Sequence, residues 1–235
     1  TPVPTPAEAA YYEQLGLRMI PPEPRDSGDE IEAAARGELP ALVAERDIRG
    51  DLHMHSTWSD GRDTIDDMVF AAQRLGYHYL AITDHSERSL ASRKLNAADI
   101  PRQRREIERV RGRVQGIEVL HGIEVDIMHD GSLDFDDAQL EGFDIVLASL
   151  HDHGGHDAET LTSRYLRAIA HPLVNVITHP ANRAPGRSHR IEAAVQGCSS
   201  FERHPERKAQ RMALDVGVAC RWQRHRGELF SRALD

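Results

Sequence analysis

The sequence contains a recurring pattern of histidines and carboxylates at the ends of short apolar segments. Histidine is unusually frequent, with 14 residues among 235. His53 and His55 stand two residues apart at the end of the first such segment. In an extended strand this spacing places both imidazoles on one face. Imidazole is the commonest metal ligand in proteins, so the pattern points to a metal site.

Five successive apolar segments end in a residue of this kind. The candidate ligands in chain order are His53, His55, Asp60, His85, Glu124, His151 and His179. One histidine in such a place would be an ordinary core or surface residue, but five in succession indicate a metal cluster. Mixed nitrogen and oxygen donors suit zinc, manganese or iron. Several such ions generate hydroxide and hold the attacking and leaving oxygens of a phosphate ester, so the pattern predicts a phosphoesterase.

The elements that must position these residues alternate between strand and helix. The apolar, β-branched segments typical of buried strands are 48–53, 79–82, 117–125, 143–150 and 174–177. The segments with helical periodicity are 64–75, 101–114 and 158–170. This alternation predicts an α/β fold with a parallel sheet and helices outside it. Chemistry in such folds gathers at the carboxyl ends of the strands, which is where the candidate ligands stand.

Several sequence blocks resemble the signature motifs of the PHP (polymerase and histidinol phosphatase) superfamily. They are DLHMHS at 51–56, SDG at 59–61, ITDHS at 82–86 and GIEVD at 122–126. Further blocks are closer still to the C-terminal PHP domain of bacterial family X DNA polymerases. These blocks lie at 15–23, 46–53, 130–135 and 179–187. The blocks occur in order between about residues 11 and 187, which makes the resemblance specific.

The resemblance implies a distorted (β/α)7 barrel with two or three divalent ions at the strand ends. The implied ligand sets are His53, His55 and Glu124 for the first ion, Asp60 and His85 for the second, and His151 and His179 with a bridging Glu124 for the third. Glu124, Asp60 and His85 are the expected catalytic groups. Manganese is the expected metal, with zinc or iron as alternatives.

The end of the chain departs from the family pattern. Arg183 and Arg187 are expected phosphate contacts by charge and position. The family's last strand carries an Asp-x-His motif, which this sequence lacks after residue 179. His225 is the nearest replacement, with Gln223 where the aspartate is wanted. We therefore expect a barrel that is incomplete or irregular after residue 187, by divergence or by a frameshift, and a weakened activity.

The resemblance implies a metal-dependent phosphoesterase of the 3′–5′ exonuclease type. It would act on DNA 3′ ends in repair, beside a polymerase module upstream in the full-length protein. The alternatives are a stand-alone phosphatase of the histidinol phosphatase type and a catalytically impaired scaffold. Residues 1–47 are expected to form an appendage before the PHP domain at 48–235, in which 180–235 diverge. That appendage weighs against the stand-alone phosphatase, which should begin near the first His-x-His.

Composition narrows the setting of this activity. A net charge of −9 argues against duplex binding through a broad basic surface. Cys198 and Cys220 are the only cysteines, which excludes a disulfide framework and fits a reducing cytoplasm. No apolar run approaches the roughly 20 residues of a membrane span. We expect a cytoplasmic protein without membrane contact and, since Thr1 stands in place of an initiator methionine, a piece of a longer chain.

Overall fold

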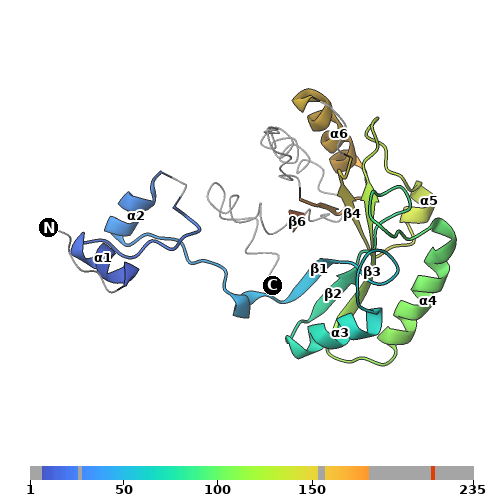
Figure 1. Ribbon diagram of the computed structural model, residues 1–235, viewed down its shortest axis with the longest axis horizontal. Helices are drawn as coiled ribbons and strands as arrows, with labels where there is room; N and C mark the ends of the chain where they lie inside the picture. The colour runs from blue at the N-terminus through green and yellow to red at the C-terminus, as the bar shows by residue number, and fades with distance from the viewer. Residues whose placement is uncertain (1–6, 26–27, 153–156, 180–212, 215–235) are drawn as a thin grey trace, which may run out of the picture. The chain divides into compact units, whose positions relative to one another are not determined.

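The chain divides into two compact units, Thr1–Ile48 and Arg49–Asp235. The computed structural model describes residues 7–25, 28–152, 157–179 and 213–214 (Figure 1). Within these ranges no helix combines the length and the apolar character that crossing a bilayer requires.

The first unit contains two helices of seven residues each, α1 (Glu8–Gln14) and α2 (Glu30–Arg36), and a helical turn, η1 (Glu45–Asp47). Three prolines between α1 and α2, at positions 21, 22 and 24, prevent helix continuation there. The Arg25 guanidinium donates to the carbonyl of Ile20 at 2.7 Å and pairs with Glu8 at 2.8 Å. Among its described hydrophobic residues only Ile20 and Ala34 are buried, so the unit has a minimal core of its own.

The second unit is built on a parallel sheet whose strands lie in sequence order. The strands described are β1 (Gly50–Met54), β2 (Tyr79–Ile82), β3 (Glu118–Asp126), β4 (Ile145–Ser149), β5 (Val176–Ile177) and β6 (Ala213–Leu214). All neighbouring pairs are parallel, and helices occupy the connections between β1 and β5. The helices of these connections are α3 (Ile65–Arg74), η2 (Ala97–Asp99), α4 (Ile100–Arg111), α5 (Asp137–Leu140) and α6 (Ala158–Ala170). The predicted α/β class with a parallel sheet is confirmed.

The long strand β3 gives the sheet its curl. Its first part, Glu118–His121, pairs with β2, whereas the part from Gly122 to Asp126 pairs with β4. The two neighbours of β3 are therefore offset along it, and such stagger accompanies the tilt of strands in a barrel. The result is a curled half-barrel, with α3 and α4 packed against β2 and β3 (Figure 1).

The two faces of the sheet have different contents, because successive side chains of a strand point to opposite sides. Leu80 and Ile82 of β2 pack with Ile107 of α4 in the core beneath the helices. Ala81 belongs instead to a smaller apolar cluster, with Leu147 of β4. On β3, Gly122, Glu124 and Asp126 alternate with Ile123 and Val125, which belong to the hydrophobic core. This alternation decides which side chains of β3 reach the site.

Candidate metal centre

All seven ligand candidates meet in one pocket at the carboxyl ends of the strands. The residues that line it include His53, His55, Asp60, His85, Glu124, His151 and His179. The cavity has a volume of about 380 Å³. The structure thus brings together residues separated by as much as 126 positions in the chain.

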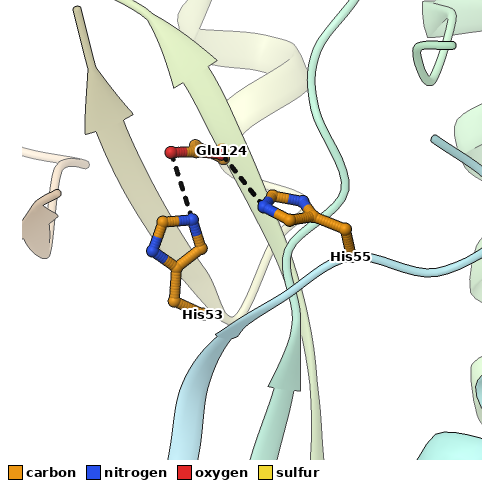
Figure 2. Close-up of side chains that lie close together, drawn as sticks. All are labelled: His53, His55 and Glu124. Carbon is orange, nitrogen blue, oxygen red and sulfur yellow. Dashed lines mark ion pairs between the residues drawn. The ribbon is translucent and has the colours of Figure 1, made fainter. Parts of the chain in front are cut away.

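Glu124 stands at the centre of this pocket and is fully buried. Nε2 of His53 lies 3.1 Å from its Oε1, and Nε2 of His55 lies 3.5 Å from its Oε2. Figure 2 shows the two rings, which come from the end of β1, directed at the carboxylate from separate sides. The first strand therefore supplies one histidine to each oxygen of the same carboxylate.

Three histidines from the later strands complete the ring around Glu124. Nδ1 of His85 lies 3.0 Å from Oε2, while Nε2 of His151 and of His179 lie 3.5 and 3.1 Å from Oε1. His85 follows β2 and forms an isolated parallel β-bridge with Glu124, which fixes the backbone of His85 beside β3. The hydroxyl of Thr178 also donates to Oε1 at 3.1 Å. One carboxylate thus faces five imidazoles.

This surrounding keeps Glu124 ionised. Burial by itself raises the pKa of the carboxyl, but hydrogen bonds from His151, His179 and His53 outweigh that effect and hold the pKa well below its ordinary range. An unpaired buried carboxylate would cost several kcal/mol, so the histidines are also what makes its burial possible. Glu124 is therefore a negatively charged group with nitrogen donors around it.

The donor set fits divalent ions. Buried polar atoms without a hydrogen-bond partner include Nδ1 of His55, His85 and His179 and Oε2 of Glu124. His85 Nδ1 and Glu124 Oε2 are close, yet they do not form a hydrogen bond of acceptable geometry. Buried polar atoms in proteins nearly always have a partner, and an ion between these atoms would supply one.

Three overlapping triads could each hold an ion, with ligand atoms within 4.8 Å of one another. They are His53–His55–Glu124, His55–Asp60–His85 and His85–Glu124–His151. The first matches the set inferred from sequence. His55 belongs to both the first and the second set, and His85 belongs to both the second and the third. The third set contains His85 where the family resemblance implied His179. Sharing of ligands favours ions that lie close together.

The sequence profile of the PHP domain family matches residues 51–179, more than half of the chain. This chain belongs to the PHP family. The predicted membership is confirmed, and all seven candidate ligands lie within the matched span.

Relatives of this PHP domain are named either as a polymerase with exonuclease activity or as phosphatases. DNA polymerase/3′-5′ exonuclease PolX of Bacillus subtilis (strain 168) is 40% identical over 182 residues, which are 77% of this chain and 32% of that protein. A Citrobacter koseri protein named Probable phosphatase is 33% identical over 158 residues, covering 65% of this chain and 60% of the relative. The chain spans about a third of the first relative and less than two thirds of the second. The predicted similarity to a family X polymerase is confirmed.

A solved structure supports the fold assignment. Histidinol phosphate phosphatase of Lactococcus lactis subsp. lactis Il1403, in complex with zinc, L-histidinol and phosphate, superimposes with a TM-score of 0.50 at 18% identity. The likeness covers 72% of each chain. At this identity it shows a shared fold, the PHP-type α/β arrangement.

Asp126 contacts the candidate ligand His151 and was not singled out from the sequence. Its Oδ1 lies 2.6 Å from Nδ1 of His151 and leaves Nε2 of that ring facing Glu124. Burial lowers the pKa of His151, but hydrogen bonds to Asp126 and Glu124 raise it to about 10. Carboxylates behind metal-binding histidines orient the ring in this way. Its position two residues after Glu124, hence on the same face of β3, was the available signal.

Asp84 is a second missed residue, fully buried behind the pocket. It accepts hydrogen bonds from the backbone N–H of Ser56 at 2.7 Å and of Ser59 at 3.1 Å. The hydroxyls of the same serines donate to it at 2.7 and 2.6 Å, and Nε2 of Gln103 donates at 2.6 Å. Because these serines flank the turn between His55 and Asp60, Asp84 ties that turn to the end of β2.

His121 belongs to this buried network and faces away from the pocket. Its Nε2 lies 2.9 Å from Oε1 of Gln103, on α4. Burial, and next the charge of Arg104, lower the pKa of His121 to about 4. Since His121 and Glu124 are three positions apart on β3, their side chains leave opposite faces of the sheet. This parity explains why one is a pocket residue and the other is a core histidine.

The remaining described histidines lie outside the pocket lining. His78 is exposed, His129 pairs with Asp152 at 3.3 Å, and His171 ends α6 with Nε2 3.2 Å from Asp137.

His179 has a backbone φ of 27°, the only positive value among the described non-glycine residues. Such conformations are uncommon and cluster at functional sites. The other predicted residues, Arg183, Arg187 and His225, lie outside the described residues, as do His153, His156, His189 and His204.

Proposed function

We propose that this PHP domain is a metal-dependent exonuclease that removes nucleotides from DNA 3′ ends. The observation that carries the proposal is the set of three overlapping triads, two of which share the carboxylate of Glu124. Overlapping triads favour ions close enough to share one phosphate, the arrangement that phosphodiester hydrolysis requires. The 40% identity to a polymerase and 3′–5′ exonuclease selects DNA among phosphate esters.

In this proposal each of the seven candidate ligands has a role that follows from its position in the pocket. His53, His55 and Glu124 hold a first ion, Asp60 and His85 a second, and His151 and His179 with Glu124 a third. Divalent ions, with Mn²⁺ as our first choice, supply hydroxide at neutral pH and offset charge on the phosphate. Glu124, Asp60 and His85 are placed where these sets overlap or adjoin, which makes them the proposed catalytic residues.

The reaction is hydrolysis. A water oxygen attacks phosphorus, and the bond to the 3′ oxygen of the preceding nucleotide breaks. That oxygen takes a proton, so the products are a DNA 3′ hydroxyl and a 5′-nucleotide. Asp126 and Asp84 take no part in bond changes in this scheme; they hold His151 and the turn before Asp60 in place. Because the matched residues are 32% of the Bacillus subtilis polymerase/exonuclease, we further propose that the domain belongs to a longer polymerase and acts in the cytoplasm.

The test is shortening of a 5′-labelled single-stranded DNA by the full chain at millimolar Mn²⁺. We expect stepwise loss from the 3′ end, at least 100-fold slower in Glu124→Gln. Glu118→Gln is the matched control, because Glu118 begins the same strand but is exposed. A variant Glu124→Gln as active as wild type contradicts the proposed centre.

A second candidate is a phosphomonoesterase, favoured by the 33% identity to a protein named Probable phosphatase. The same preparations would be given L-histidinol phosphate and 4-nitrophenyl phosphate. Hydrolysis of these monoesters with no action on DNA would replace the exonuclease with this candidate. Bound metal without either activity would identify a scaffold.

A further inference from the structure

One large side chain of the pocket cannot bind metal. Leu90 lines the cavity together with Ser89 and Ala91, and it is 63% exposed. The other described lining residues are histidines, carboxylates, a serine and an alanine. Leu90 is therefore the single large aliphatic side chain among them.

The segment that carries Leu90 is held firmly beside the metal ligands. At its start the N–H of Ser86 donates to the carbonyl of Glu124 at 3.0 Å, and at its end the N–H of Leu95 donates to the carbonyl of His85 at 2.8 Å. In between, Arg93 donates to the carbonyl of Gly61 at 2.8 Å, next to Asp60. The loop is thus fastened to three of the ligand-bearing segments.

The charged and the apolar surface of the pocket lie at different depths. Glu124 is fully buried, whereas the Leu90 side chain is largely in water. A phosphate held among the ligands therefore has its ester substituent on the open side, where Leu90 stands. Small-molecule pockets combine a few polar anchors with apolar contacts that fix the rest of the ligand.

We propose that Leu90 contacts the sugar and base of the nucleotide whose phosphate is cleaved. The inference rests on the proposed exonuclease activity and adds to it a specificity contact for the nucleoside part of the substrate, which has a wide, partly apolar surface. Covering an exposed leucine with such a group removes apolar area from water and strengthens binding. A phosphate with a methyl substituent cannot do so.

The test compares two diesters with the same scissile bond, thymidine 5′-(4-nitrophenyl phosphate) and methyl 4-nitrophenyl phosphate. Both release nitrophenolate, and the ratio of their kcat/KM values is independent of metal loading. We expect Leu90→Ala to lower this ratio about tenfold and to leave the methyl ester unaffected. Leu75→Ala is the matched control, since Leu75 is 65% exposed and lies at the end of α3, outside the pocket lining.

An unchanged ratio in Leu90→Ala, or an equal loss with both esters, would overturn the assignment. If wild type hydrolyses neither ester at any Mn²⁺ level, binding decides the role of Leu90, and the proposed function fails if DNA is not shortened either. In that case the dissociation constants of dTMP and methyl phosphate are measured by calorimetry on the Mn²⁺-loaded chain. A wild-type preference for dTMP that falls about tenfold in Leu90→Ala supports the contact, and an equal preference in both proteins refutes it.

Discussion

Oδ1 of Asp126 lies 2.6 Å from Nδ1 of His151, on the side of the ring away from Glu124. The contact fixes which nitrogen of His151 faces the pocket. Both residues stand at strand ends, Asp126 as the last residue of β3 and His151 just after β4. The orientation of one candidate ligand is therefore set by a neighbour that belongs to none of the three triads.

Asp126→Asn is expected to weaken metal binding. An amide is a poorer acceptor than a carboxylate, so the imidazole loses both its orientation and part of its basicity. Loss of such a contact typically reduces metal affinity by about 10–100-fold. Equilibrium dialysis against Mn²⁺ measures this, with the exposed Asp130→Asn as control. Equal affinity in the two variants would show that Asp126 does not position His151.

Glu124→Gln is expected to reduce stabilisation by metal strongly, because two of the three triads contain Glu124. A ligand that binds only the folded state raises its stability in proportion to the logarithm of ligand concentration over Kd. The wild-type melting temperature should therefore rise as Mn²⁺ is titrated into metal-free protein. The glutamine removes the charge shared by two of the three triads, so the melting temperature of this variant should rise much less. Glu118→Gln should follow wild type, and a full metal response in Glu124→Gln would contradict the central role.

Asp84→Asn is expected to destabilise the fold directly. Asp84 accepts five hydrogen bonds in a fully buried position, and an amide nitrogen cannot accept those that reach it. Leaving buried donors without the carboxylate that accepts from them lowers the free energy of unfolding by about 3 kcal/mol. Urea unfolding in EDTA measures the change without metal, and the exposed Asp63→Asn is the control. A loss below about 0.5 kcal/mol would refute the network.

His121 predicts a pH dependence of stability. Its pKa is about 4 in the folded chain, against an ordinary value near 6.5. Between these values the unfolded chain binds a proton that the folded chain does not, so stability is full above pH ~6.5 and falls as the pH drops to ~4. The shift corresponds to about 3 kcal/mol at most.

The variant His121→Gln carries no titrating group at this position and should lose less stability over that window. Urea unfolding in EDTA from pH 7 to 4 compares it with wild type and with the exposed His78→Gln. Because all other histidines are common to wild type and His121→Gln, their difference isolates this residue. Parallel pH profiles for these two proteins would show that His121 is not buried in neutral form.

The elements and the ligand candidates were predictable because both depend on local pattern. Apolar runs that are buried on both faces mark parallel strands, and the segments at 79–82 and 117–125 correspond closely to β2 and β3. Strand ends were less well predicted: the segment at 143–150 contains β4 (Ile145–Ser149), and the segment at 174–177 contains the shorter β5. A strand ends where its neighbour stops pairing, which depends on another part of the chain.

By itself the sequence determined the α/β class and a list of residues that stand where strands end, since both follow from neighbouring positions. The tertiary structure decided how those residues are used. It placed Glu124 among five imidazoles, turned His121 away by the alternation of β3, and put Leu90 at the open side of the pocket. It also joined Asp84 to Ser56 across 28 residues and Asp126 to His151 across 25. Such contacts depend on register and curl, which no local pattern contains.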